Sequence, residues 1–204
     1  MRSVRALAVA LPLAFCGCGG SVPPTHFYVI EPQDVPRVEA LDTATTGGLT
    51  IGVETFRVDP PYDQDRIVYR ANKGSAEVGF YAYHRWAAPL GRMLPGVVAS
   101  AYSGVPGAQS IEPMTSGRSY DAFLRGRVLV FEEIDTADGP RIRVHVILRL
   151  DASDGSQLWT ATLSRDTDVS SNNVGSVVEQ MRSALAEAIR ESRPSLQSAL
   201  QASH

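Results

Sequence analysis

The alternation of apolar and polar residues over 141–150 constrains the fold of this chain more than any other stretch. One set points to one side of an extended chain: Ile142, Val144, Val146, Leu148 and Leu150. The other set is Arg141, Arg143, His145 and Arg149. Successive side chains of a strand point to opposite faces of a sheet, so this period of two predicts a strand with one buried face and one solvated face.

Neighbouring segments extend this strand into an antiparallel meander. Residues 119–133 form a long strand candidate, and Asp138-Gly139 is a typical hairpin turn between it and 141–150. Asp154-Gly155 predicts the next turn, before a strand over 157–164. Shorter strands are predicted earlier in the chain, at 27–30, 49–58 and 66–70, with a loop over 33–48.

Two amphipathic helices are predicted to cover the apolar face of this sheet. The first spans 80–102, with apolar residues at intervals of three and four, and is kinked or divided because Pro89 and Pro95 interrupt it. The second follows the cap candidates of residues 170–173 and ends at Pro194. We therefore predict an α+β two-layer sandwich with a mostly antiparallel sheet and two helices on one face. The single domain spans 27–194, and 195–204 is a flexible polar tail.

The N-terminus indicates export and lipidation. Arg2 and Arg5 precede an apolar run over 6–15 that is too short to span a bilayer, which is typical of a secretory signal peptide. Cys18 follows a small residue, as in the bacterial lipobox, whereas Cys16 follows Phe15. We predict a signal peptide over 1–17, lipidation at Cys18 and a tether over 18–26. Modification at Cys16, or an ordinary cleaved signal with two incidental cysteines, are the alternatives. Since Gly19 stands where an aspartate retains such proteins in the inner membrane, we expect the outer membrane.

Charge and hydropathy narrow the classes of partner. Residues 1–17 contain two of the 19 basic residues and none of the 22 acidic ones, so their removal changes the net charge from −3 to −5. This acidic balance argues against a nucleic-acid partner. No apolar run after residue 17 is long enough to cross a membrane.

The sequence predicts no catalytic, metal or cofactor site. The four histidines, at 26, 84, 145 and 204, show no metal-ligand spacing with each other or with a cysteine. The chain also lacks a Gly-x-Ser-x-Gly elbow and a phosphate-binding loop. A lipid-anchored hydrolase with an atypical site remains an alternative, and it requires Ser119 or Ser170 to lie next to His145.

Arginines and one tryptophan are the candidate partner-binding residues, because these side chains are enriched at interaction hot spots. They are Arg66, Arg70, Arg85, Trp86, Arg141 and Arg143. The structural alternative is that Trp86 fills the core, that Arg85 forms an ion pair and that the polar side of strand 141–150 is an ordinary solvated face.

Three segments carry a resemblance to a known family: the lipoprotein start, Arg66-Ile67-Val68-Tyr69-Arg70, and Tyr83-His84-Arg85-Trp86-Ala87-Ala88-Pro89-Leu90. With 27–30, their order and spacing resemble the ABC-type transport auxiliary lipoproteins, which include the PqiC-like proteins. Ala88 stands where an acidic residue is common in that family. The resemblance implies a non-enzymatic outer-membrane lipoprotein that docks an MCE-domain protein, a lipid-binding bridge across the periplasm. It also implies phospholipid or another hydrophobic cargo, and homo-oligomeric rings in some members. An envelope assembly lipoprotein that binds a β-barrel is a further alternative.

Overall fold

The computed structural model describes residues 22–34 and 47–203. The predicted signal peptide, both cysteines and most of the predicted 33–48 loop lie outside these residues. The described strands are β1 (His26–Tyr28), β2 (Leu49–Val53), β3 (Arg57–Val58), β4 (Arg66–Arg70), β5 (Gly79–Trp86), β6 (Ala108–Pro113), β7 (Ala122–Thr136), β8 (Gly139–Ala152) and β9 (Gln157–Asp168). The helices are a short 3-10 turn, η1 (Pro32–Asp34), and the α-helices α1 (Leu90–Tyr102) and α2 (Val174–Ala202).

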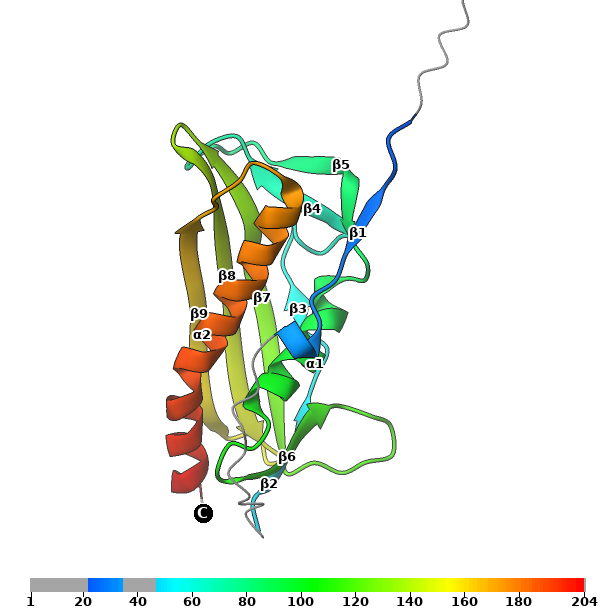
Figure 1. The fold of residues 1–204 in the computed structure, drawn as a ribbon. Helices are drawn as coiled ribbons and strands as arrows, with labels where there is room; N and C mark the ends of the chain where they lie inside the picture. The colour runs from blue at the N-terminus through cyan, green and yellow to red at the C-terminus, as the bar shows by residue number, and fades with distance from the viewer. Residues whose placement is uncertain (1–21, 35–46, 204) are drawn as a thin grey trace, which may run out of the picture.

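Strand β7 is the centre of one mixed sheet (Figure 1). Along one side it pairs antiparallel with β8, which pairs antiparallel with β9, so the predicted meander is confirmed. Along its other side β2, β3 and β4 pair with it in succession, and all three run parallel to it. The long ladders are therefore antiparallel, whereas the short strands add parallel pairing that local alternation does not predict.

The first predicted helix is wrong over its N-terminal part, because residues 79–86 form strand β5 and the helix begins only at Leu90. The aromatic residues of this stretch suit a strand, and Pro89 disfavours helical backbone in the residue before it. Pro95 lies inside α1 and cannot donate to the carbonyl of Gly91. The N–H of Phe56 donates to that carbonyl instead, at 3.0 Å, so another segment satisfies the acceptor that Pro95 leaves unpaired.

The last helix continues beyond its predicted end. Asn173 caps α2 by accepting a hydrogen bond from the Ser176 N–H at 2.8 Å, but Pro194 lies inside the helix, which runs to Ala202. The predicted flexible tail is therefore wrong for residues 195–202. An interior proline costs about 3 kcal/mol. Burial of Leu196 and Leu200, at 1% and 0% exposure, offsets this cost at about 1.5–3 kcal/mol for each side chain.

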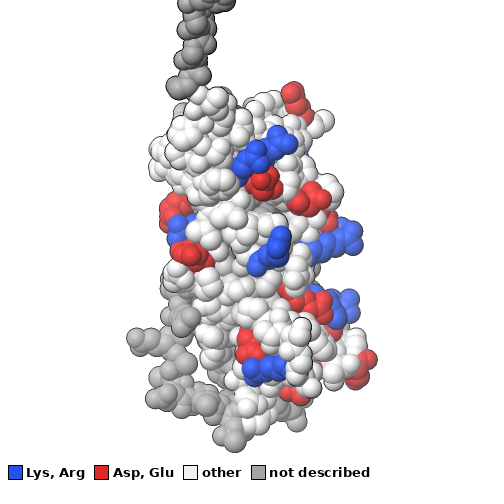
Figure 2. Space-filling model, turned by 90° about the vertical axis from the view of Figure 1, so that its right-hand side faces the viewer, with Lys and Arg blue, Asp and Glu red and all other residues white. Residues whose placement is uncertain are grey.

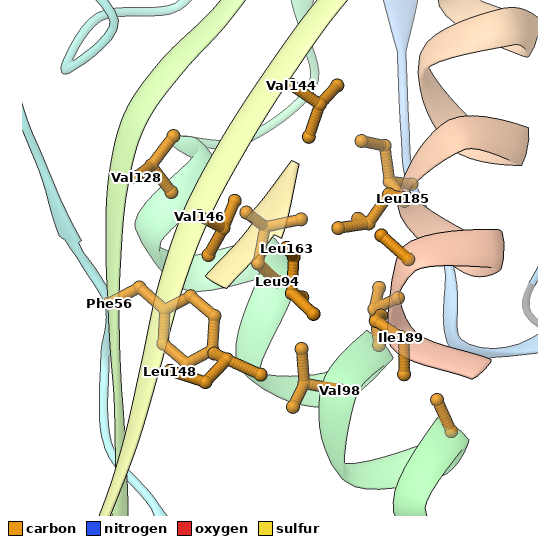
Figure 3. Packing of buried hydrophobic residues seen from close by; sticks show 14 of the residues in the cluster. Phe56, Leu94, Val98, Val128, Val144, Val146, Leu148, Leu163, Leu185 and Ile189 are labelled. Atoms are coloured by element: carbon orange, nitrogen blue, oxygen red, sulfur yellow. The ribbon is translucent and has the colours of Figure 1, made fainter. Parts of the chain in front are cut away.

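Both α-helices pack on the same face of the sheet and enclose one core (Figure 1). Figure 3 shows Leu94 and Val98 of α1, and Leu185 and Ile189 of α2, directed at apolar side chains of the meander. The meander contributes Val144, Val146, Leu148 and Leu163 to this region. The predicted α+β two-layer sandwich is therefore confirmed, and the opposite side of the sheet, which we call the outer face, carries no described helix.

Candidate functional site

All five predicted arginines lie on the outer face. In the ladders, Arg66 lies opposite Arg85, and Glu132 of β7 lies opposite Arg143. Arg70 and Arg141 lie on either side of Ile134 of β7, which pairs with Arg70 of β4 and with Arg141 of β8. Directly opposite residues point to the same side of a sheet, and the apolar neighbours of Arg141 and Arg143 point toward the helices. The five side chains therefore project away from the core.

Glu132 connects two of these arginines through a buried carboxylate. Its Oε2 accepts hydrogen bonds from the Tyr62 hydroxyl at 2.6 Å and from Arg70 Nε at 2.8 Å. Arg143 Nη1 lies 3.7 Å from Oε1. Burial, and then the bond to Glu132, raise the pKa of Tyr62 to about 12, so its hydroxyl stays a donor. We call these four residues the Glu132 cluster.

Arg141 and Arg85 also face carboxylates. Arg141 donates to Asp166 at 2.9 Å and to Asp168, and Arg143 lies 3.9 Å from the same Asp166. Arg85 donates to Asp65 at 2.7 Å. These pairs are partly exposed, so each contributes little to stability in solution. They do affect the electrostatic surface: positive and negative side chains alternate on the outer face, so it is not a basic patch.

Arg66 is the exception among the predicted arginines. It is exposed, and its guanidinium lies over the ring of Phe80 at 5.1 Å from the centroid. Within the described residues it forms no ion pair with a carboxylate. Its charge is therefore available to a partner.

Trp86 is not available to a partner, contrary to the prediction. It is 3% exposed and packs edge-on against Phe131, with the ring centroids 5.6 Å apart. The reason is strand alternation: Arg85 points outward, so its neighbour Trp86 points into the core. The structural alternative for this residue is correct.

A cluster of aromatic and histidine side chains joins β1 to β5, and sequence inspection did not reveal it. His26 stacks on His84 with centroids 5.1 Å apart, and the Tyr28 hydroxyl lies 2.8 Å from His84 Nδ1. The Tyr81 ring contacts His84 edge-on, and its hydroxyl donates to Glu133 at 2.7 Å. Burial, and then the nearby His26, lower the pKa of His84. The parallel pairing of β1 with β5 brings these residues together, and no local pattern indicates it.

The serine–histidine pairs required for a hydrolase do not form. Ser119 precedes β7 at the end of the sheet where β8 reaches Ala152, seven residues from His145. Ser170 lies six residues beyond Ser164, the β9 residue paired with His145. At about 3.3 Å per residue, each separation is roughly 20 Å or more. Within residues 22–34 and 47–203 there is also no group of three or more His, Cys, Asp or Glu side chains placed to hold a metal ion.

Two surface hollows lie among the described residues. One, of about 280 Å³, lies at the start of α1 and includes Asp63, Leu90 and Arg92. The other, of about 500 Å³, is lined by Lys73, Thr136, Asp138, Arg141 and Asp168. Neither is lined by a histidine, serine or cysteine.

Residues 28–191 match the family of ABC-type transport auxiliary lipoprotein components. The chain belongs to this family. The resemblance found in the sequence is thus confirmed, and the protein is an auxiliary lipoprotein associated with an ABC transport system. No helix of the described residues combines the length and apolarity needed to cross a bilayer.

Solved structures show the same fold. The chain is similar to protein XCC0632 from Xanthomonas campestris, with 22% identity and a TM-score of 0.63 over 88% of this chain and 96% of that one. An uncharacterised protein gives 15% identity and a TM-score of 0.63 over 85% and 99%. A PelC dodecamer from Paraburkholderia phytofirmans gives 15% identity over 76% and 94%, with a TM-score of 0.41 that is too low to equate the folds. A search of curated proteins gives no match.

Proposed function

We propose that this chain is a non-enzymatic outer-membrane lipoprotein of an ABC transport system that moves phospholipid or another hydrophobic molecule between membranes. In this role it docks an MCE-domain protein that bridges the periplasm. The observation that carries the proposal is family membership over 28–191, combined with the lipobox-like cysteine at the end of a signal-peptide pattern.

Cys18 provides the membrane attachment in this proposal. Each acyl methylene that enters the bilayer contributes about 0.8 kcal/mol, so several chains on one cysteine make the attachment effectively permanent. Seven residues lie between Cys18 and His26, the start of β1, so eight residue-to-residue steps join them. At no more than about 3.6 Å per residue, the folded domain stays within roughly 29 Å of the membrane surface.

The outer face is the docking surface in this proposal. Its arginines are held by carboxylates of the same chain, as in the Glu132 cluster, so their positions are set before a partner binds. Charged groups in a fixed arrangement give an interface its orientation and specificity more than its affinity. A homo-oligomeric ring of several copies, as the family resemblance implies, would present several such faces around one bridge.

The proposal is tested by crosslinking the full-length lipidated protein in its own cells. A photoreactive amino acid replaces Ser164, an exposed outer-face residue of β9, or Glu187, an exposed residue of α2 on the helical side. Mass spectrometry then identifies the crosslinked partners. We expect an MCE-domain protein from the Ser164 position and much less of it from the Glu187 position.

The same experiment distinguishes the alternatives. Recovery of β-barrel assembly components alone would replace the transport proposal with an assembly role. Equal recovery of the MCE-domain protein from both positions would leave the transport role intact but refute docking through the outer face. Fractionation of the Cys18→Ala variant with the outer membrane would refute the anchor.

A further inference from the structure

Exposed apolar side chains gather at one end of the molecule. The large hydrophobic residues that the described chain leaves exposed are Val22, Phe27, Val29, Tyr83 and Met114. Four of these five lie on β1, on β5 or on the segments that flank β1, and Phe27 is 65% exposed. Single exposed apolar residues are ordinary, but a group of them at one place indicates a surface that is covered in use.

Strand pairing aligns this group with a free cation. Phe27 of β1 lies opposite Arg85 of β5, and Arg85 lies opposite Arg66 of β4. Tyr83 lies two residues from Arg85 within β5, so strand alternation directs it to the same side, and Val29 follows directly after β1. We call Val22, Phe27, Val29, Tyr83 and Arg66 the tether-end patch. Figure 2 faces this side and shows mostly uncharged surface over its upper part, where the described chain begins.

We infer that the tether-end patch lies on the lipid surface to which the chain is anchored, an inference that rests on the lipid anchor of the proposed function. Val22 is four residues from Cys18, so the extended chain places it within about 14 Å of the anchor. A tether this short keeps the patch at a high effective concentration next to the bilayer. No other apolar cluster of the described residues lies so close in sequence to the anchor, since Met114 is isolated in the segment after β6.

The side-chain types of the patch suit the boundary between hydrocarbon and headgroups. Phenylalanine and tyrosine rings bury apolar area there, and the tyrosine hydroxyl remains hydrated. Arg66 supplies a guanidinium that pairs with lipid phosphate, because no carboxylate of the described residues neutralises it. The neighbouring Arg85 is already paired with Asp65 and brings no uncompensated charge.

This contact orients the domain. Figure 1 shows the start of the described chain at one end of the sheet and the C-terminus of α2 at the other. With β1 on the lipid, the segment between β6 and β7, which contains Met114, is directed away from the membrane. The β7–β9 part of the outer face then remains accessible to a periplasmic partner.

Hydroxyl-radical footprinting tests the inference, because Met114 provides a built-in reference. The lipidated protein is placed in phosphatidylethanolamine–phosphatidylglycerol vesicles at a ratio of one copy per vesicle. The mature chain carrying Cys18→Ala is measured in buffer. We expect oxidation of Phe27 and Tyr83 to fall about tenfold on the vesicles, since side chains buried roughly 5–10 Å into the boundary lose contact with water. Met114 should remain equally reactive in both samples.

Three results would overturn the inference. Equal oxidation of Phe27 and Tyr83 on vesicles and in buffer would show that the patch stays in water. Protection in buffer that rises with protein concentration would assign the patch to a second copy. Protection that appears only after the bridge protein is added would assign it to that partner. Mass analysis of Cys18 separates these results from failure of the proposed function: an unacylated cysteine refutes the anchor itself.

Discussion

Replacing the carboxylate of Glu132 with an amide tests whether buried pairing holds the outer-face arginines in place. The Glu132→Gln substitution keeps the shape of the side chain and one oxygen that can accept from Tyr62. It removes the negative charge that Arg70 Nε contacts at 2.8 Å and that Arg143 Nη1 approaches to 3.7 Å. Two arginines are then left without their buried counter-charge.

The structure sets the size of the effect. Removing one partner of a fully buried ion pair costs about 3–5 kcal/mol. Here the carboxylate is 1% exposed, but the side chains of Arg70 and Arg143 are 21% and 30% exposed, so water partly solvates both arginines, and Asp166 remains 3.9 Å from Arg143. We therefore expect a loss of about 2–3 kcal/mol in the free energy of unfolding, since charged hydrogen bonds contribute about 1.5–3 kcal/mol each. In a domain of this size that loss corresponds to roughly 4–12 °C in Tm.

Urea unfolding followed by tryptophan fluorescence is a suitable assay, because Trp86 packs on Phe131, the neighbour of Glu132. Glu179→Gln is the matched control: its partner Arg182 is on the same helix, its side chain is 63% exposed, and the expected loss is below about 0.5 kcal/mol. If Glu132→Gln costs no more than this control, charge pairing does not hold the arginines, and the argument for a docking face arranged before binding fails.

Three further predictions concern other parts of the fold. Leu200→Ala should lower the free energy of unfolding in urea by about 2–5 kcal/mol, because Leu200 is fully buried. A negligible loss would instead support the flexible tail that the sequence predicted. In α1, Gly91→Ala should destabilise the fold, because the added Cβ would lie 2.5 Å from a backbone oxygen. Gly96→Ala should stabilise it by about 1 kcal/mol, because the added Cβ would lie 3.6 Å from its nearest neighbour. Thermal melts in which both variants shift Tm in the same direction would refute this. Because the pKa of His84 is lowered in the fold, its contribution is present above about pH 6.5 and lost as the pH falls below it. The hydrogen-exchange protection factors of β1, which are corrected for the intrinsic slowing of exchange in acid, should therefore fall as the pH falls. An equal fall in a His84→Asn variant would exclude His84 as the cause.

The meander could be predicted from the sequence because its signal is local. Alternation over 141–150, with an Asp-Gly turn on each side, determines both the pairing and the buried face. The helix predicted over 80–102 was correct from Leu90 onward and wrong before it, because the apolar residues of β5 also fit a helical spacing. Aromatic composition and Pro89 favoured the strand, and pairing with β4 and β1 decided it. The end of α2 failed differently: Pro194 is a valid stop signal, but burial of Leu196 and Leu200 outweighs it.

The candidate site shows the same division between local and long-range information. That Arg141 and Arg143 lie on the solvated face follows from their own strand. The pairing of Glu132 with Arg70 cannot be predicted in this way. These two residues are 62 positions apart, and only the parallel pairing of β4 with β7 brings them together. The burial of Trp86 depended on whether its segment is a helix or a strand, so one error in secondary structure also misplaced a candidate residue.

The attachment of the N-terminal segment determines what an anchored domain of this kind can reach. From His26 onward the chain is held to the fold: β1 pairs with β5, Ile30 is buried at 2% exposure, and Asp34 forms an ion pair with Arg182 of α2. These three contacts involve the sheet, the core and a helix, so the segment from 26 to 34 moves with the domain. In the proposal that Cys18 carries the lipid, the reach of the domain is therefore set by the residues between Cys18 and His26. Fully extended, these residues span at most roughly 25–29 Å, which sets how far the domain can lie from a lipid attached at Cys18.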